Sequence, residues 1–113
     1  MKFVALAAAI AALTASSALA ATPKLNGTVG PGFTITLKQG TAKVSKLKAG
    51  TYKFVIADKS SIHNFHLKGP GVDKKTSVSN TGTTTWTITL KKGKYTFVCD
   101  PHASFMKGSF TVS

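Results

Sequence analysis

The amino-acid sequence predicts an all-β domain, folded as an antiparallel sandwich or barrel, and three observations support this prediction. Apolar and polar residues alternate in several short runs, which places one face of each run in a core and the other in water. Threonine and aromatic residues are frequent in these runs, and both favour strands over helices. Segments rich in glycine, proline and asparagine separate the runs at short intervals, as turns do in sandwiches and barrels.

Residues 1–20 are expected to be a cleaved signal peptide rather than part of this fold. Lys2 gives a short positive start, an alanine-rich apolar run covers residues 3–13, and Ala18-Leu19-Ala20 supplies small residues for cleavage before Ala21. The apolar run is shorter than the ~20 residues that span a bilayer, which disfavours an uncleaved anchor. We therefore expect a signal peptide, 1–20, and a mature protein that is periplasmic or secreted and does not span the membrane.

In chain order, the alternation predicts strands over residues 33–38, 52–57, 85–90 and 95–99. The side chains expected to face the core are Phe33, Ile35, Leu37, Tyr52, Phe54, Ile56, Trp86, Ile88, Leu90, Tyr95, Phe97 and Cys99. Turn residues fall at 30–32, 39–40, 49–50, 69–71, 80–82 and 92–93. No helical periodicity, repeat or linker interrupts the segment after residue 20, so one domain, 21–113, is expected.

The composition is basic and excludes several classes of function. The 113 residues include 15 lysines but no arginine, and their net charge is +12. Because the lysines are scattered along the chain, arginine is absent and the protein is expected to be exported, nucleic acid is not an expected partner. A basic surface of this kind is either merely solvated or attracts an acidic protein or an anionic membrane. The single cysteine excludes a disulfide within a monomer, and three aspartates leave little for chemistry with paired carboxylates.

The residues that carry chemistry lie near the C-terminus. Cys99 is expected at the end of a strand, Pro101 turns the chain, and His102 and Met106 follow in the loop. A thiolate, a thioether and imidazoles together favour copper over hard cations, and two histidines, one cysteine and a weak axial methionine form a blue-copper site. A lone cysteine is more often a small buried apolar residue. The histidine and methionine at short spacing favour a ligand here.

A second source of imidazole lies upstream. His63 shares the parity of Phe65 and Leu67, which look like core positions, so His63 is expected to point inward. His66 has the opposite parity and is expected to be a surface or strand-packing histidine rather than a ligand. The sequence therefore predicts a metal site made of His63, Cys99, His102 and Met106.

These segments resemble the plastocyanin and amicyanin group of the cupredoxins. Residues 93–102 are similar to the copper-loop segment of that group, and residues 106–112 are similar to its methionine and final strand. The pair His63-Asn64 resembles the upstream His-Asn pair of the family. One departure is the loop length, because three residues separate His102 from Met106, whereas plastocyanins have four and amicyanins two.

The resemblance implies a Greek-key β-sandwich or barrel of the cupredoxin type that holds one copper ion, cycling between Cu(I) and Cu(II). It also implies equatorial ligands at His63, Cys99 and His102 and an axial ligand at Met106. Asn64 would tie the two ligand loops together. Tyr95 would pack and form hydrogen bonds near the start of its strand.

The function expected from these features is the shuttling of single electrons between redox partner proteins by a small monomer. The ring edge of His102 would be the exit for the electron, with Pro101, Ala103 and Phe105 as an apolar rim and lysines around it for a partner with an acidic surface. One alternative is a periplasmic copper carrier or tolerance protein that sequesters or delivers the metal without electron transfer. Another is an immunoglobulin-like interaction module without metal. An enzyme is not expected.

Overall fold

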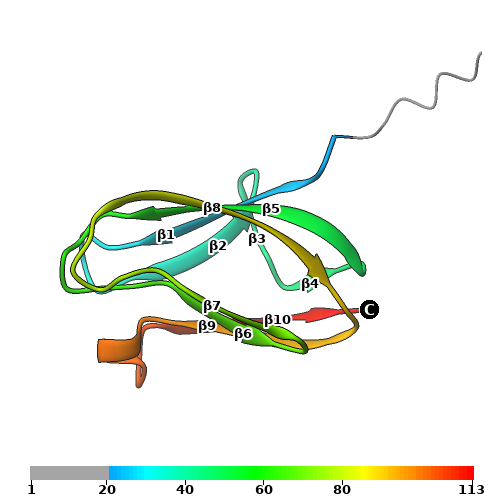
Figure 1. Ribbon diagram of the computed structural model, residues 1–113. Coiled ribbons are helices and arrows are strands. Elements are labelled where there is room, and N and C mark those ends of the chain that lie inside the picture. Colours follow the sequence, from blue (N-terminus) through cyan, green and yellow to red (C-terminus); the bar gives the residue numbers. More distant parts are fainter. Residues whose placement is uncertain (1–20) are drawn as a thin grey trace, which may run out of the picture.

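Two five-stranded β-sheets face each other in the structure, a computed structural model that describes residues 21–113 (Figure 1). The first sheet has the order β3-β2-β1-β5-β8, formed by Ala42–Lys43, Ile35–Gln39, Lys24–Val29, Gly50–Asp58 and Gly82–Leu90. The second has the order β4-β10-β9-β6-β7, formed by Lys46–Leu47, Lys107–Val112, Gly93–Val98, His66–Gly69 and Val72–Lys75. The predicted all-β sandwich is confirmed, and the predicted signal peptide lies outside the described residues.

Most neighbouring strands are antiparallel, as predicted, but two pairs are parallel. β1 runs parallel to β5, and β4 runs parallel to β10. The cause is the path of the chain, which leaves the first sheet after β3, adds β4 to the second sheet and returns to the first as β5. Such crossings between sheets allow strands that run in the same direction to become neighbours.

The strands predicted over residues 52–57, 85–90 and 95–99 appear as β5, β8 and β9, and the side chains predicted to face the core do so. Trp86 on β8 is only partly buried, although it packs against the core. The prediction for Phe33 is wrong, because β2 begins at Ile35 and Phe33 lies in the preceding loop with 57% of its side chain exposed. Cys99 directly follows β9 and is fully buried.

Stacked aromatic rings fill the core between the sheets. The rings of Phe65 and Phe97 lie 5.4 Å apart at an interplanar angle of 7°, and those of Tyr95 and Phe110 lie 5.2 Å apart at the same angle. The hydroxyl of Tyr95 donates to the carbonyl of Lys91 and accepts from its amide, at 2.9 Å each, which confirms the predicted hydrogen bonding near the strand's start.

Three loops meet at one end of the sandwich, drawn at the left of Figure 1. They are residues 30–34 between β1 and β2, residues 59–65 between β5 and β6, and residues 99–106 between β9 and β10. The last of these loops contains the 3-10 turn η1, Asp100–His102. Among residues 21–113, no helix is long and apolar enough to cross a membrane.

Candidate metal centre

Three donor atoms from two of these loops converge at this end of the sandwich. The Nδ1 atoms of His63 and His102 lie 3.1 Å apart, and the Cys99 Sγ lies 3.6 Å from each. A point equidistant from atoms so spaced lies about 2.0 Å from each, close to the roughly 2.0–2.3 Å of metal bonds to histidine and cysteine in zinc sites. The three residues therefore fit a single ion without any rearrangement.

The backbone of the C-terminal loop holds two of these donors in place. Pro101 opens η1, and the amide of His102 donates to the carbonyl of Cys99 at 3.0 Å. The amide of Cys99 donates to the carbonyl of Met106, and the amide of Met106 donates to the carbonyl of His102, at 3.0 and 2.8 Å. Met106 is only 1% exposed. The loop thus binds the backbone of Met106 to both Cys99 and His102.

Asn64 joins the two loops that carry the donors. Its side-chain carbonyl accepts from the amide of Asp100 at 2.7 Å, and its side-chain amide donates to the Asp100 carboxylate at 2.8 Å and to the carbonyl of Thr76 at 3.3 Å. Asn64 is 1% exposed, so little water competes for these bonds. The contacts confirm the link between the loops that the resemblance implied.

His66 does not join the donor cluster. Its Nδ1 lies 2.8 Å from the Asp100 carboxylate and its Nε2 lies 2.5 Å from the Asp73 carboxylate, so both ring nitrogens face acidic groups. The predicted outward direction is confirmed, but the side chain is buried, with 7% exposed, rather than on the surface. No sequence pattern indicates this bridge, because its partners lie 7 and 34 residues away and meet only through the strand register.

The hydrogen bonds of His66 lower the pKa of both carboxyl groups that it contacts, those of Asp73 and Asp100. The hydrogen bond from His66 lowers the pKa of Asp73. Burial opposes the ionisation of Asp100, but hydrogen bonds from Asn64 and His66 outweigh this effect, so the pKa of Asp100 is also below its ordinary value. Both carboxylates are therefore ionised over the neutral pH range, which places negative charge next to the ligand loop.

An exposed aromatic cluster covers the donor atoms. The Phe33 ring lies 5.2 Å from the ring of His63 and 5.1 Å from that of His102, and the Phe105 ring lies 5.7 Å from His102. The side chain of Ile62 is 51% exposed on a neighbouring loop. Sequence reasoning named Phe105 as part of an apolar rim but missed Phe33, which its alternation had assigned to the core.

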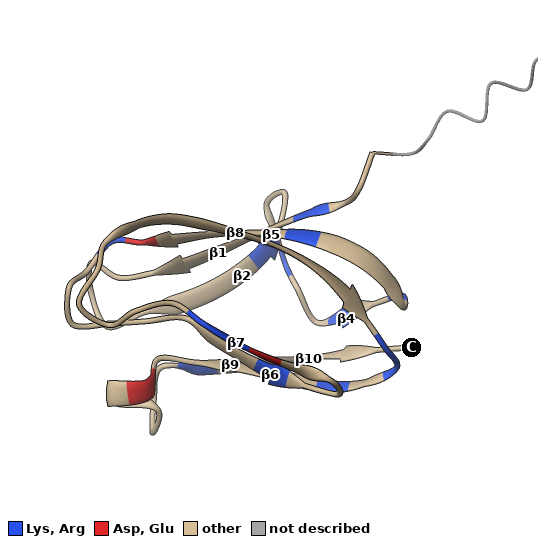
Figure 2. Cartoon of the chain, viewed as in Figure 1, with Lys and Arg blue, Asp and Glu red and all other residues tan. Residues whose placement is uncertain are grey.

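Lysines are few in the loops at the donor end. Figure 2 shows lysines on the strands of both sheets, whereas the three described loops at the donor end contain a single lysine, Lys59. The nearest lysines in sequence are Lys59 and Lys107, at the borders of two of the loops. The side chains of Phe33, Ile62 and Phe105 make the rim largely apolar. Attraction of an acidic partner by lysines near the rim stays a prediction.

Comparisons with known proteins agree with this architecture. The chain matches the family of cupredoxin-like domains over residues 3–112. No curated protein sequence matches it.

Several solved structures of rusticyanin have a similar fold. Reduced rusticyanin is 21% identical, with a TM-score of 0.57 over 80% of this chain and 78% of its own. A second rusticyanin structure, described as a copper protein, is 20% identical, with a TM-score of 0.60 over 80% and 76%. The rusticyanin of Thiobacillus ferrooxidans is 22% identical, with a TM-score of 0.55 over the same shares. These identities establish a shared fold, and the family match over nearly the whole sequence shows that the chain belongs to the cupredoxin family.

Proposed function

We propose that this protein is a blue-copper electron carrier that binds one copper ion and passes single electrons between redox partners. His63, Cys99 and His102 would be the equatorial ligands and Met106 the axial ligand. The observation that supports this proposal most strongly is the triangle of Nδ1, Nδ1 and Sγ atoms, with sides of 3.1, 3.6 and 3.6 Å. When bound, copper would supply a one-electron couple between Cu(I) and Cu(II).

The chemistry of the donors favours copper over other metals. Thiolate and thioether ligands are soft and suit Cu(I), while imidazole also binds Cu(II). No carboxylate belongs to the donor group among the described residues, which disfavours calcium, magnesium and manganese. A structural zinc site usually has four strong ligands, whereas this group offers three and a thioether.

The burial of the ligands favours electron transfer over copper delivery. Cys99 and His63 are fully buried and Met106 is 1% exposed, so release of an ion would require the loops to open. His102 is the partly exposed member of the donor group, and its ring lies under Phe33 and beside Phe105. An electron can leave through this ring edge while the ion stays in place. Rigid ligands also keep reorganisation small.

The same arrangement argues against an enzymatic role. Catalytic metal sites keep an open coordination position for water or substrate. Here four ligands would surround the ion, and aromatic side chains cover the face through which a substrate would enter.

The cellular setting that we propose follows from the N-terminal sequence. Residues 1–20 would direct export and be removed, which leaves residues 21–113 as a monomer in the periplasm or outside the cell. The partners would be redox proteins that dock briefly on the rim formed by Phe33, Ile62 and Phe105. Acidic surfaces on such partners would be attracted by the lysines of the sandwich.

A spectroscopic titration tests the site. Addition of a cupric salt to the mature protein should produce an intense thiolate-to-copper absorption band that saturates at one ion per chain. The band should disappear in Cys99→Ser and be lost or strongly altered in His63→Gln. His66→Gln is the comparison, because it makes the same substitution three residues away and outside the donor group. All proposed ligands remain in it, so the band should persist, with at most a shift from the loss of the Asp100 bridge. A colourless wild-type protein would refute the proposal.

A second experiment separates electron transfer from copper delivery. An electron carrier should give a reversible voltammetric wave and lose copper slowly to a chelator. A delivery protein should instead transfer copper rapidly to an acceptor. Fast exchange without a reversible wave would replace the first function with the second.

A further inference from the structure

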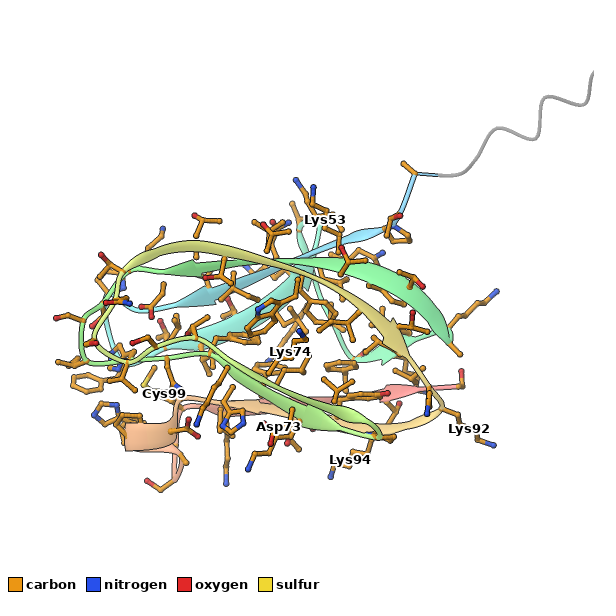
Figure 3. All side chains as sticks on the ribbon, in the orientation of Figure 1. Lys53, Asp73, Lys74, Lys92, Lys94 and Cys99 are labelled. Carbon is orange, nitrogen blue, oxygen red and sulfur yellow. The ribbon has the colours of Figure 1, made fainter. Side chains whose placement is uncertain are left out.

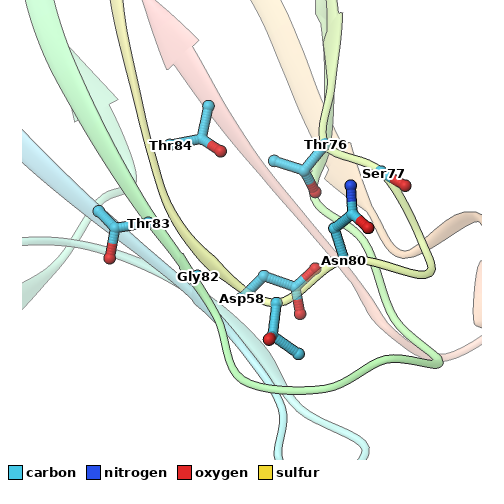
Figure 4. Close-up of a pocket in the computed structure, with 8 residues that line it drawn as sticks. Asp58, Thr76, Ser77, Asn80, Gly82, Thr83 and Thr84 are labelled. Carbon is cyan, nitrogen blue, oxygen red and sulfur yellow. The ribbon is translucent and has the colours of Figure 1, made fainter.

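A second polar site lies between the sheets, apart from the donor cluster. It is a cavity of about 220 Å³ at the end of β5, where β8 begins and the segment after β7 crosses over. Its lining includes Asp58, Thr76, Ser77, Asn80, Thr81 and Thr84. Figure 4 shows the Asp58 carboxyl group among these oxygen-bearing side chains. The cavity is therefore lined by one acidic group and several neutral oxygen atoms.

The Asp58 carboxyl group is incompletely bonded. Asp58 is only 5% exposed, and its Oδ1 accepts a hydrogen bond from the amide of Ser60 at 3.0 Å. Its Oδ2 is buried and has no hydrogen-bond partner among residues 21–113. A buried carboxylate oxygen without a partner is costly, because burial removes its hydration and no hydrogen bond replaces it. A ligand that supplies positive charge at this oxygen would remove the cost.

The surroundings of the cavity select a cation with a preference for oxygen. Its lining has no sulfur and no imidazole, so it does not suit copper or zinc. The lining also contains no lysine, and residues 76–90 contain no charged residue at all, although the chain carries a net charge of +12. No ammonium group therefore lines the cavity to neutralise the carboxylate. Hydroxyl, amide and carboxylate oxygens are ligands of hard cations.

We propose that this cavity binds a hydrated divalent cation of the calcium class, with the Asp58 carboxylate as its charged ligand. Calcium accepts six to eight oxygen ligands, including waters, in flexible geometry. Magnesium demands a tighter octahedron and usually binds one or two carboxylates together with phosphate groups, so a single carboxylate in a roomy cavity suits it less. Because calcium affinity rises with the number of charged ligands, a site with one carboxylate should have a dissociation constant in the range of weak extracellular modules, roughly 10⁻⁴–10⁻³ M.

The bound cation would join parts of the fold that are distant in sequence. Asp58 ends β5, Thr84 lies on β8, and Thr76 and Asn80 belong to the segment that connects the second sheet to the first. An ion held by all of these stabilises the folded state, because the unfolded chain does not bring the ligands together. This inference is independent of copper, since none of the proposed copper ligands lines the cavity.

Calorimetric titration and thermal unfolding of the mature protein with calcium chloride test the proposal. Wild-type protein should bind one calcium ion, and at ten times the dissociation constant its Tm should rise by roughly 5–10 °C. Magnesium or sodium chloride at equal ionic strength should give a smaller shift. Asp58→Asn should weaken binding at least tenfold, whereas Asp73→Asn, which removes the same charge from an exposed carboxylate on the other sheet, should bind as wild type does.

Further variants keep the test decisive. If Asp58→Asn does not fold, Asn80→Ala and Thr84→Val, both at exposed positions of the lining, should weaken calcium binding several-fold. Cys99→Ser should bind calcium normally, which separates this site from the copper site. The proposal is overturned if wild-type protein shows no saturable binding at millimolar calcium, if sodium gives an equal shift, or if the lining variants bind as tightly as wild type.

Discussion

At the scale of single residues, Phe33 shows how a loop side chain packs against two of the donor residues. Its ring lies edge-on to those of both His63 and His102, at interplanar angles of 69° and 87°. Such edge-to-face pairs contribute roughly 0.5–1.5 kcal/mol beyond the burial of area. Phe33 therefore restrains the two imidazole rings while it shields them from water.

Replacing Phe33 should loosen the copper ligands more than it destabilises the fold. Because the side chain is 57% exposed, Phe33→Ala should lower the free energy of unfolding of the metal-free protein by only about 1 kcal/mol. Removal of copper by a chelator should accelerate several-fold, because water reaches both rings. Phe105→Ala, which uncovers His102 but not His63, is the control and should have the smaller effect. Equal release rates in the two variants would contradict this role.

Asp58 should make the stability of the calcium-free protein depend on pH. Burial raises its pKa, although the Ser60 amide and the charge of His63 oppose part of the shift. Because the folded state holds this proton more tightly than the unfolded state, the resulting stabilisation is present below the ordinary aspartate pKa of about 4 and is lost as pH rises through the raised value.

The measurement is the free energy of unfolding of wild type and Asp58→Asn in a calcium chelator, from pH 4 to pH 7. The stability of wild type relative to the variant should fall as the pH rises. Asp73→Asn serves as the comparison, because the pKa of Asp73 is lowered and its pH dependence has the opposite sign. A constant difference between wild type and Asp58→Asn across this range would show that Asp58 ionises in the fold as it does in water.

At the scale of elements, the donor geometry depends on how the loops are joined. The 59–65 loop supplies His63, the 99–106 loop supplies the other donors, and Asn64 links the two through Asp100. The bridge of His66 to Asp73 and Asp100 attaches the second loop to β7 as well. The ligands are thus held by buried hydrogen bonds between elements rather than by the loop backbone alone.

Asn64→Ala should therefore disturb both folding and the site. The change leaves the buried amide of Asp100 without its acceptor, which should lower the free energy of unfolding by about 1–3 kcal/mol in urea titrations. The thiolate-to-copper band should also shift or weaken. Asn80→Ala removes an exposed asparagine from a different loop and should alter neither property in calcium-free buffer. An Asn64→Ala protein with wild-type stability and spectrum would show that the link does not position the ligands.

The sequence could predict the elements whose alternation is long and regular, and it failed elsewhere for physical reasons. β5 and β9, and β8 from Trp86 onward, turn every second side chain toward the other sheet, which the pattern reveals. β1 escaped notice because Gly27 occupies an inward position, where an added Cβ would lie 2.6 Å from the Ile56 side chain. Phe33 has the parity of a core residue, but the strand starts two residues later.

The donor residues could be named from chemistry alone, but their supporting contacts could not. Cysteine, histidine and methionine at short spacing favour a soft metal, and the parity of His63 indicates that it points inward as well. The partners of His66, by contrast, depend on the register in which β6 pairs with β7 and β9. The Asp58 cavity depends on a crossing between sheets. Both are products of tertiary structure, which local patterns do not encode.

At the scale of the whole molecule, charge and docking are separated in space. Lysines cover the strands of both sheets, and Figure 3 shows several of them projecting away from the sandwich, while the end that carries Cys99 has an apolar rim. Attraction of an anionic partner therefore acts over the whole body at long range. In the proposed docking, the final contact at the rim would be apolar and brief.

This separation predicts how the rate of electron transfer depends on salt. Oxidation by an anionic small-molecule oxidant should slow as ionic strength rises, and oxidation by a cationic oxidant should accelerate, because the net charge sets the sign. Single neutralisation of Lys59 or Lys107 should change the rate less than about twofold, since neither dominates the field. In stopped-flow experiments, a tenfold loss in one of these variants would instead indicate a local steering site.

The central claim is that one sulfur and two imidazole nitrogens surround a single copper ion at the end of the sandwich. X-ray absorption at the copper edge of the loaded protein measures this directly. It should show two nitrogen neighbours and one short sulfur neighbour at roughly 2.0–2.3 Å, and the short sulfur should vanish in Cys99→Ser. A first shell made only of nitrogen and oxygen atoms in the wild-type protein would contradict the account.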